Sequence, residues 1–306
     1  MPDFSVVIPC HNEDGNVRLV YERVCAQLTD FEIIFIDDGS TDGTLPILEQ
    51  LAESDERVKY LSFTRNFGLD AAFHAGFKYA SKQWIIQIDA DLQSPPEEIP
   101  KLVEKALTGF DIVFARRSGR QDGLVKKLGS LLQHLIAIHI FKIEFPLGAS
   151  TFRIIKTEVA KKVISRRTAY PYFLAECMRM GAKVAFVNVT HSARNAGRSK
   201  FTLLKSLLAT ARLLVGHSLV PLNFFALVTL LAVPAFLFLP QKLSLPIVLC
   251  LLSAGLWIQA CYIARIVRDL AFDNLYYVRE SNLAVDAKDN LFGEDGVPAV
   301  MGRPTS

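Results

Sequence analysis

Two aspartates one residue apart, Asp89 and Asp91, follow an apolar run (WIIQI) and precede a double proline. Side chains at positions i and i+2 of an extended segment point to the same side, so both carboxylates could bind one cation. Carboxylate oxygens are ligands that Mg²⁺ and Mn²⁺ prefer, and Gln93 could add a carbonyl oxygen. The spacing is therefore compatible with a divalent-cation site at the end of a buried strand, and the accompanying motifs strengthen this interpretation. A structural alternative is that Asp91 or Ser94 caps the following helix, and both roles can hold together.

A second acidic pair, Asp37 and Asp38, ends the run IIFIDD and is followed by a Gly-Ser-Thr turn. Burying carboxylates without compensation is costly, so we expect this pair to accept hydrogen bonds from a ligand. A nucleoside base and ribose are the obvious candidates. A turn with a helix cap would explain Gly39 to Asp42 but would leave Asp37 without a role. The stretch VVIPCHNE likewise ends an apolar run in polar side chains that could hold a base or ribose.

The elements that must position these residues follow from hydrophobic periodicity. Short apolar runs predict five strands buried on both faces, at Phe4–Pro9, Glu32–Asp37, Val58–Phe63, Trp84–Asp89 and Asp111–Ala115. Helix-length patterns lie between them, at Asn16–Leu28, Thr44–Ser54, Asp70–Ala80 and Glu97–Leu107. Such alternation predicts an α/β fold with a mostly parallel sheet between helices. Ligands of these sheets bind beyond the carboxyl ends of the strands, which is where the polar motifs occur.

The ordered set of motifs VVIPCHNE, DDGSTDGT, TRNFGLDAAFHAGF and DADLQSPPEEIP resembles the family-2 inverting glycosyltransferases with a GT-A fold. The most similar subgroup is the polyprenyl-phosphate sugar transferases, such as dolichyl-phosphate mannose synthase and the bacterial undecaprenyl-phosphate glycosyltransferases. The resemblance covers about residues 4–200. It implies a mixed, mostly parallel sheet flanked by helices, and transfer of a sugar from a nucleotide-diphosphate sugar to a polyprenyl phosphate.

The resemblance also implies roles for individual residues. It implies that the donor nucleotide is bound by Pro9, Asn12, Glu13, Asp37, Asp38, Arg65, Asn66 and Asp89. It implies that Mg²⁺ or Mn²⁺ is held by Asp89, Asp91 and Gln93, and that Asp89, Asp91, Arg117 and Arg153 are catalytic. For Ala72 and Gly76, in the helix after Arg65, we expect close packing and not a ligand contact.

Basic residues near the apolar C-terminal region are candidates for the acceptor site, because Arg and Lys suit phosphate oxygens. Two segments carry them: ARRSGRQDG after the fifth strand, and HSARNAGRSKF, which is similar to the family's segment just before the membrane. The acceptor-phosphate set comprises Arg117, Arg120, Arg194, Arg198, Ser199 and Lys200. Attraction to anionic lipid headgroups is the alternative for these residues.

The segment GASTFRIIK departs from the family pattern. Many relatives carry an acidic residue near its Phe-Arg pair, where this chain has Ser150 and Thr151. A sugar hydroxyl acceptor would need a carboxylate base, whereas a phosphomonoester, with a second pKa of about 6, arrives largely ionised. The departure therefore favours a lipid-phosphate acceptor, with catalysis resting on positioning and charge neutralisation.

Two uncharged stretches, residues 221–239 and 244–263, each approach the roughly 20 residues that cross a bilayer core. The composition is 51% hydrophobic, and basic residues flank the pair on both outer sides, which predicts cytoplasmic chain ends. A buried core hairpin is the alternative. Two amphipathic segments, Leu124–Ile140 and Lys200–Gly216, could pack on the sheet or lie on the membrane surface.

The expected organisation has four parts. They are a cytoplasmic GT-A catalytic domain at residues 1–199, a juxtamembrane amphipathic helix at 200–217, two transmembrane helices within 218–266, and a cytoplasmic C-terminal segment at 267–306. We expect the last 18 residues, from Asp289, to be disordered. The N-terminus lacks a secretory-signal pattern, so we expect the first domain to remain in the cytosol. The two apolar stretches and the resemblance imply a multi-pass protein of the bacterial inner membrane, compatible with a homo-oligomer.

Other classes fit the sequence less well. A net charge of +3 argues against a nucleic-acid binder, and the absence of a G-x-G-x-x-G motif after the first strand disfavours a Rossmann dehydrogenase. Five cysteines without a C-x-x-C pair indicate neither a disulfide framework nor a zinc site. The remaining alternatives are a polymerising glycan synthase, although Q-x-x-R-W is absent, and an inactive nucleotide-sugar-binding membrane scaffold.

Overall fold

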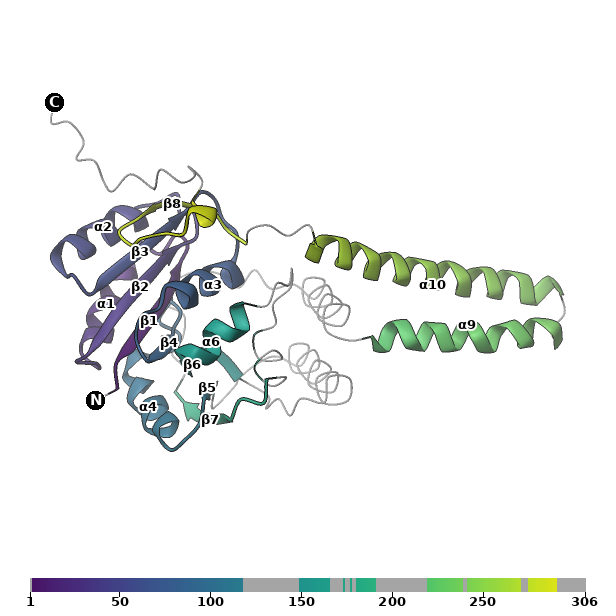
Figure 1. The fold of residues 1–306 in the computed structure, drawn as a ribbon, viewed down its shortest axis with the longest axis horizontal. Coiled ribbons are helices and arrows are strands. Elements are labelled where there is room, and N and C mark those ends of the chain that lie inside the picture. Colours follow the sequence, from purple (N-terminus) through teal and green to yellow (C-terminus); the bar gives the residue numbers. More distant parts are fainter. Residues whose placement is uncertain are drawn as a thin grey trace, which may run out of the picture.

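A computed structural model of the 306-residue chain describes residues 2–117, 149–165, 173, 177, 180–190, 219–238, 241–270 and 275–290. Within these residues the core is one mixed eight-stranded sheet with the order β7-β5-β6-β4-β1-β2-β3-β8 (Figure 1). The strands are β1 (Phe4–Cys10), β2 (Phe31–Asp37), β3 (Val58–Phe63), β4 (Trp84–Gln87), β5 (Ile112–Arg117), β6 (Ala149–Lys156), β7 (Val184–Val189) and β8 (Val278–Ser281). The predicted mixed, mostly parallel sheet is therefore confirmed.

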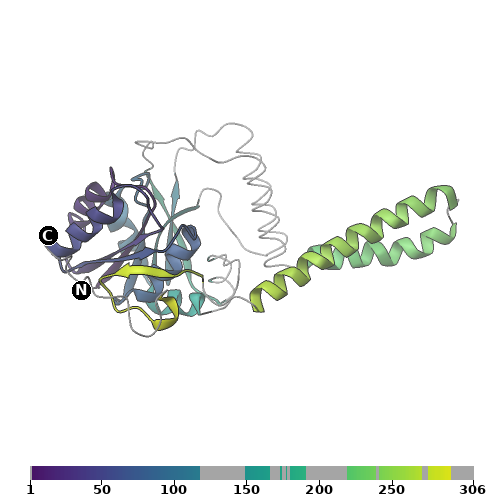
Figure 2. The same cartoon turned by 90° about the horizontal axis from the view of Figure 1, so that it is seen from above.

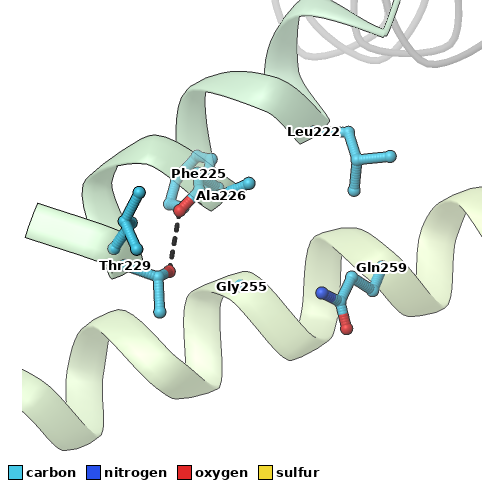
Figure 3. A pocket seen from close by; sticks show the side chains of 7 residues that line it. Leu222, Phe225, Ala226, Thr229, Gly255 and Gln259 are labelled. Atoms are coloured by element: carbon cyan, nitrogen blue, oxygen red, sulfur yellow. Dashed lines mark hydrogen bonds between the residues drawn. The ribbon is translucent and has the colours of Figure 1, made fainter. Parts of the chain in front are cut away.

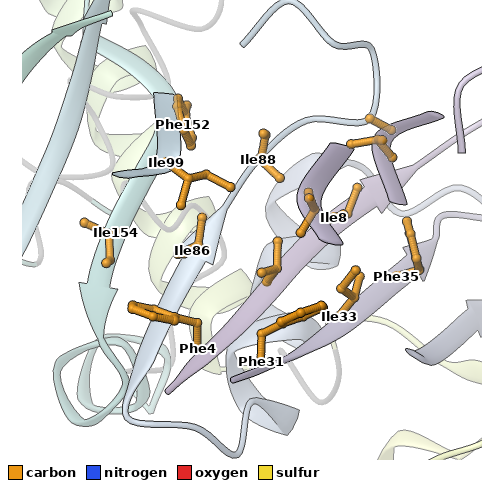
Figure 4. Close-up of a cluster of buried hydrophobic side chains, with 14 of the residues drawn as sticks. Phe4, Ile8, Phe31, Ile33, Phe35, Ile86, Ile88, Ile99, Phe152 and Ile154 are labelled. Carbon is orange, nitrogen blue, oxygen red and sulfur yellow. The ribbon is translucent and has the colours of Figure 1, made fainter. Parts of the chain in front are cut away.

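Helices cover both faces of this sheet. They are α1 (Val17–Cys25), α2 (Thr44–Ser54), α3 (Leu69–Tyr79), a short 3₁₀ turn (Pro96–Glu98) continuing into α4 (Ile99–Leu107), and α6 (Thr157–Ile164). One hydrophobic cluster joins α1, α2 and α4 to one face, and a second joins α3 and α6 to the other. Alternate residues of β1 enter different clusters, with Ile8 in the first and Val7 in the second. Figure 4 shows the first cluster, in which Phe152 and Ile154 of β6 lie near Ile86 of β4.

The strand order creates a switch point beside β1. The chain proceeds outward from β1 to β2 and β3, all parallel, and then returns to place β4 parallel to β1 on its other side. Crossover connections leave such a pair in opposite directions, so the carboxyl ends of β1 and β4 border a crevice suited to a ligand. Close packing of α3 supports this edge, because an ideal Cβ at Gly76 would lie only 2.2 Å from Val7 Cγ1. The packing role expected for Gly76 is confirmed.

Three strands were not predicted from periodicity: β6, β7 and β8. β6 pairs antiparallel with both β4 and β5, which makes the sheet mixed. β8 pairs antiparallel with β3 at the opposite edge, although some 215 residues separate them in the chain. Asp289 and Asn290, the first two residues of the segment expected to be disordered, are instead buried, and that part of the prediction is wrong. The remaining residues of that tail lie outside the described part of the chain.

Two long antiparallel helices, α9 (Val220–Phe238) and α10 (Gln241–Leu270), extend away from the sheet (Figures 1 and 2). They coincide with the two predicted apolar stretches, and α10 continues seven residues beyond the predicted end at 263. Among the described residues one segment, Leu249–Val267, is long and apolar enough to cross a membrane. Most of its side chains are exposed, with Trp257 at 71%, whereas Tyr262 is buried. The crossing of the bilayer by both helices stays a prediction.

The two helices contact each other along a shallow groove of about 340 Å³, shown in Figure 3. Thr229 donates its hydroxyl hydrogen to the carbonyl of Phe225 within α9, at 2.7 Å, so this polar group is satisfied locally. The segments Leu124–Ile140 and Lys200–Gly216, for which amphipathic helices were predicted, lie outside the residues that the structure describes.

We expect Asp55→Asn to destabilise the catalytic domain in a pH-dependent way. The Asp55 carboxylate accepts hydrogen bonds from Tyr21 Oη at 2.8 Å and from Arg57 Nη2 at 2.7 Å. The hydrogen bonds from Arg57 lower the pKa of Asp55 to about 2. Because the folded-state pKa lies below the unfolded value, the stabilisation is fully present at neutral pH. It decreases as the pH falls below the unfolded value and is lost as the pH falls through about 2.

The expected loss is about 1–2 kcal/mol at pH 7, allowing for the partly exposed Arg57, and roughly half of that at pH 3. Urea unfolding of wild type and variant at both pH values measures it. Asp30→Asn is a suitable control, because the Asp30 side chain is 60% exposed. Equal destabilisation at the two pH values would show that ionisation of Asp55 does not matter.

Candidate active site

The polar ends of β1, β2, β3 and β4 converge on one cleft of about 360 Å³. Each of the four motifs identified in the sequence supplies part of its wall, as expected for adjacent parallel strands. The residues that line it are Pro9, Cys10, His11, Glu13, Asp38, Asn66, Gly68, Leu69, Ala72, Asp89, Ala90 and Asp91. Carboxylate and amide groups from four separate loops are thus presented to a single space. An open polar cleft of this kind can bind a ligand with sugar hydroxyls and phosphate groups.

The loops after β1 and β2 hold each other in place. Asn12 has a positive φ of 58°, and its Oδ1 accepts a hydrogen bond from the backbone N–H of Thr41 at 2.8 Å. Ser40 Oγ accepts from the backbone N–H of Asn12 at 3.0 Å, and Thr44 Oγ1 accepts from that of Glu13 at 2.9 Å. Asn12 is therefore engaged in fixing the loops and is not among the lining residues, whereas Glu13 is.

The two members of the Asp37–Asp38 pair have different surroundings. Asp37 is 1% exposed, and its carboxylate accepts hydrogen bonds from the backbone N–H of Ser40 at 3.0 Å and from Ser62 Oγ at 2.7 Å. These partners compensate the buried charge from within the protein, and Asp37 is not among the residues that line the cleft. Asp38 lines the cleft, and burial raises the pKa of its carboxyl above the usual value.

Asp38 also shapes the loop after β3. Its two carboxylate oxygens accept hydrogen bonds from the backbone N–H groups of Phe67 and Gly68, at 2.6 and 2.9 Å. Asn66 and Gly68 of this loop line the cleft. Arg65 is exposed and lies over the Phe67 ring, with its guanidinium carbon 4.0 Å from the ring centroid. The structure thus brings Asn66 to the cleft, whereas the Arg65 side chain lies over Phe67 of the same loop and is not among the lining residues.

Asp89 and Asp91 both line the cleft. The extended geometry assumed from their i, i+2 spacing is not observed, because β4 ends at Gln87 and the motif lies in the turn that follows. Asp89 Oδ2 accepts a hydrogen bond from Thr151 Oγ1 at 2.5 Å, and Asp91 Oδ1 accepts one from the backbone N–H of Gln93 at 3.1 Å. The buried Leu92, between Asp91 and Gln93, has a φ of 58°. That conformation costs about 1–2 kcal/mol for a residue with a Cβ. Strain of this kind is typical of functional loops.

The Asp89–Asp91 pair suits a divalent cation, but the described residues do not supply a complete set of protein ligands for one. Within the described residues no group of three or more His, Cys, Asp or Glu side chains could hold a metal. Two carboxylates at the mouth of a cleft suit an ion that keeps further positions for substrate phosphates, as Mg²⁺ usually does. Gln93 is not among the lining residues, and its backbone N–H donates a hydrogen bond to Asp91.

Thr151→Val is expected to weaken activation by Mn²⁺ about tenfold, because groups that orient a metal ligand typically affect metal affinity to this extent. Valine keeps the shape of threonine and removes the hydroxyl that donates to Asp89. Titrating product formation with Mn²⁺ measures the effect, and Thr151→Ser, which keeps the hydroxyl, should behave as wild type. An unchanged Mn²⁺ requirement in Thr151→Val would show that the hydroxyl does not orient Asp89.

Arg153, predicted to be catalytic, is 7% exposed and lies on the α3 side of the sheet. Its Nε donates to Gln87 Oε1 at 2.7 Å, and its guanidinium carbon lies 4.0 Å from the ring centroid of Phe173. The rings of Phe77 and Phe114 are also near, at 5.9 and 5.6 Å. Arg153 is not among the residues that line the described cleft, so its catalytic role stays a prediction.

The predicted acceptor residues are largely beyond the structural description. The backbone of Arg117 ends β5, while its side chain is not described. The others, Arg120, Arg194, Arg198, Ser199 and Lys200, lie outside the described residues, and their roles stay predictions.

Three residues at or beside the cleft were not in the predicted set of site residues. His11 lines it and is oriented by a 2.9 Å hydrogen bond from Nδ1 to the carbonyl oxygen of Asp38. Cys10 lines it as well, and burial raises the pKa of its thiol well above the usual value, so it stays a thiol. From the sequence, Thr151 was considered only because it lies in the segment where many relatives carry a carboxylate. The hydrogen bond that the Thr151 hydroxyl donates to Asp89 was not predicted. Only His11 carried a sequence signal, since it follows the first strand beside Asn12.

Comparison with known proteins identifies the family of the chain that carries this cleft. The model of Glycosyl transferase family 2 matches residues 5–164, which include all four strand ends. The chain is a member of glycosyl transferase family 2, and the predicted family is confirmed.

Named relatives extend the match. The chain is 33% identical over 239 residues to an undecaprenyl-phosphate 4-deoxy-4-formamido-L-arabinose transferase of Photorhabdus laumondii, covering 76% of this chain and 74% of the relative. It is 31% identical over 259 residues to the protein of that name from Proteus mirabilis, covering 83% and 78%. Both alignments are longer than the family-model match, so the similarity extends beyond the conserved domain.

Among solved structures, the fold is similar to glucosyl-3-phosphoglycerate synthase from Mycobacterium tuberculosis, crystallised with Mn²⁺ and UDP-glucose. The TM-score is 0.53 at 21% identity, covering 70% of this chain and 78% of that one. At that identity the comparison establishes the GT-A-like fold and nothing finer.

Proposed function

We propose that this chain transfers a sugar from a nucleotide-diphosphate sugar, UDP-linked, to undecaprenyl phosphate, with inversion at the anomeric carbon. The reaction would occur on the cytoplasmic face of a bacterial membrane. The observation that carries the proposal is the convergence of Asp38, Asp89 and Asp91 on one cleft at the switch point of a family-2 glycosyltransferase sheet. The names of the relatives support a polyprenyl-phosphate acceptor.

The donor would occupy the cleft with its nucleoside between the loops after β1, β2 and β3. Glu13, Asp38 and Asn66 offer polar groups for the base and ribose, and Pro9 forms part of the wall. Asn12 and Asp37 would act by fixing these loops, through their hydrogen bonds to Thr41 and to Ser40. Arg65 lies next to the lining residue Asn66 and could reach the diphosphate when a donor is bound.

A bound Mg²⁺ or Mn²⁺ would be held by Asp89 and Asp91 and would neutralise charge on the departing diphosphate. The mycobacterial synthase of the same fold was crystallised with Mn²⁺ and UDP, which supports such an ion here. Thr151 holds Asp89 in position through its hydroxyl, and the backbone N–H of Gln93 holds Asp91. The two carboxylates are therefore oriented before any donor binds, as electrostatic catalysis requires.

The acceptor phosphate would attack from the side opposite the leaving diphosphate. It needs no general base, because a phosphomonoester with a second pKa of about 6 is mostly dianionic at neutral pH. Thr151, which lies in the segment where many relatives carry an acid, donates its hydroxyl to Asp89 in this structure. The basic set of Arg117, Arg120, Arg194, Arg198, Ser199 and Lys200 would bind the lipid phosphate, and Arg153 would support the acceptor side.

Membrane attachment would bring the lipid to the cleft. We propose that residues 1–199 form the cytoplasmic catalytic domain, that residues 200–217 lie along the membrane surface, and that the helices within 218–266 cross the bilayer. The mostly exposed apolar segment Leu249–Val267 supports this arrangement. Residues 267–306 would return to the cytoplasm, which makes the protein a multi-pass protein of the bacterial inner membrane.

Thermal stabilisation by a panel of nucleotides tests the donor side directly. Purified full-length protein is heated with UDP, GDP or CDP, with their sugar conjugates, and with or without Mn²⁺ or Mg²⁺. A ligand present at 100 times its Kd should stabilise the folded state by about 2.7 kcal/mol. We expect the largest shift with UDP-sugars plus Mn²⁺, and a smaller one without metal. No shift with any nucleotide would refute the proposed donor class.

A further inference from the structure

The chain returns from the end of α10 to the catalytic sheet and packs beside the donor cleft. Residues 275–290 follow α10 and place β8 along β3, which is visible as the yellow strand in Figure 2. Leu61 and Ser62 of β3 pair with Ser281 and Glu280. β3 is the strand whose carboxyl end carries the loop Thr64–Gly68, and two residues of this loop line the cleft. A segment that lies after the membrane helices thus contacts a wall of the candidate active site.

An anchor of aromatic and charged groups fixes the start of this segment. The Tyr276 ring stacks on Phe63 with ring centroids 4.8 Å apart, and its hydroxyl donates to Asp289 Oδ2 at 3.1 Å. The same carboxylate, 6% exposed, accepts from Tyr79 Oη at 2.8 Å and from Lys78 Nζ at 2.5 Å. Because α3 supplies both Lys78 and Tyr79, the segment is joined to the helix that follows the cleft loop.

The next residue, Tyr277, contacts the cleft loop itself. Its carbonyl oxygen accepts a hydrogen bond from the backbone N–H of Thr64 at 3.1 Å. The Tyr277 ring lies against the Phe67 ring, with centroids 6.3 Å apart. The Phe63 ring also packs edge-on against the Phe67 ring, with centroids 5.8 Å apart. Phe67 in turn carries the Arg65 guanidinium over its face at 4.0 Å. A continuous set of contacts therefore runs from Tyr277 through Phe67 to Arg65.

Asp38 holds the same loop from the cleft side. It accepts the backbone N–H groups of Phe67 and Gly68. The loop is thus fixed between a buried carboxylate on one side and the Tyr277 ring on the other. Loss of the Tyr277 ring would leave Phe67 held by Asp38 through its backbone and by Phe63 on part of its ring, so that the Phe67 ring and Arg65 would gain freedom. If the loop must be ordered when the ligand binds, the entropic cost of ordering lowers the affinity for the ligand and leaves the chemical step unchanged.

We propose that Tyr277 is a positioning residue of the donor cleft, acting through Phe67 on the loop Thr64–Gly68. The expected effect of Tyr277 on the donor KM rests on the proposed function, because that effect requires a nucleotide-sugar to bind in the cleft. The contact also makes the order of the cleft loop depend on the segment that follows the membrane helices.

Hydrogen–deuterium exchange and kinetics of the full-length protein in nanodiscs test the proposal. Tyr277→Ala is compared with Tyr277→Phe, which keeps the ring, and with Asn282→Ala. Asn282 lies just beyond β8, and its side chain bonds to Tyr60 N and Val58 O, far along β3 from the cleft. In Tyr277→Ala we expect exchange at residues 64–68 to rise about fivefold and KM for the UDP-sugar donor to rise similarly, with kcat unchanged. Tyr277→Phe should match wild type.

Asn282→Ala should raise exchange near Tyr60 and lower the melting temperature while leaving the donor KM at the wild-type value. Wild-type exchange at residues 64–68 in Tyr277→Ala would overturn the proposal. It would also be overturned if Asn282→Ala raised the donor KM as much as Tyr277→Ala, since the effect would then be general destabilisation. If wild type turns over no nucleotide-sugar, the proposed function fails, while the exchange comparison made without ligand still decides the role of Tyr277.

Discussion

Replacement of Asp91 by asparagine is expected to lower sugar transfer by about 10²–10³-fold, the usual cost of removing one electrostatic group that stabilises a transition state. Asp91 lines the cleft, and its carboxylate is held by the backbone N–H of Gln93, a bond that an asparagine side-chain oxygen can still accept. The variant therefore changes charge with little change in shape. If the carboxylate binds a cation that neutralises the departing diphosphate, kcat falls and higher Mn²⁺ concentrations restore only part of it.

Initial rates of product formation at a range of Mn²⁺ concentrations measure this effect. Asp30→Asn is a matched control, because it removes one surface carboxylate whose side chain is 60% exposed and which is not a lining residue of the cleft. It should retain wild-type rates. Full activity in Asp91→Asn, with an unchanged metal requirement, would remove Asp91 from the catalytic machinery.

Gly39→Ala is expected to unfold or severely destabilise the catalytic domain, by about 2–5 kcal/mol. Gly39 follows the acidic pair with a φ of +65°, a conformation that costs alanine about 1–2 kcal/mol. An ideal Cβ at this position would lie 2.4 Å from the backbone carbon of Arg65 and 2.7 Å from the backbone nitrogen of Asn66. Backbone atoms cannot rotate away, so one of the two cleft loops must move.

The melting temperature and the donor affinity of the surviving folded protein measure the result. Gly43→Ala provides the comparison four residues along, because Gly43 has a φ of −76° and its added Cβ would meet only Asp14 at an ordinary 3.6 Å. That variant should differ from wild type by less than about 1 kcal/mol. A wild-type melting temperature in Gly39→Ala would mean that the loops after β2 and β3 do not approach as closely as described.

The sequence was sufficient for the elements whose signals are local. Strands β1 to β5 are apolar on both faces because helices cover both sides of the sheet, so each is a short unbroken apolar run. Helix α2 agrees with the prediction at both ends, Thr44 and Ser54. The convergence of the four motifs also follows from the sequence, since the carboxyl ends of neighbouring parallel strands lie along one edge.

What could not be predicted depends on contacts between distant parts of the chain. β6 mixes apolar residues with Thr151 and Arg153, whose partners Asp89 and Gln87 lie 62 and 66 residues away. β8 has four residues without an apolar run, and it is a strand because β3 offers a free edge. Asp37 was correctly expected to need compensation, but Ser62 Oγ and the Ser40 N–H supply it within the fold. Its contact with a nucleotide stays a prediction.

Transfer of a radiolabelled sugar from UDP-sugar to undecaprenyl phosphate tests the central claim most directly. Full-length protein in nanodiscs containing undecaprenyl phosphate is incubated with Mn²⁺ and labelled UDP-sugars. One of these donors carries 4-deoxy-4-formamido-L-arabinose, the sugar in the relatives' names. With wild type we expect label in a lipid that organic solvent extracts, and mild acid should release the labelled sugar from that lipid. With Asp91→Asn we expect this labelled lipid to be lost. Label released as free sugar at equal rates with and without the lipid, or lipid labelling that Asp91→Asn leaves intact, would contradict the central claim.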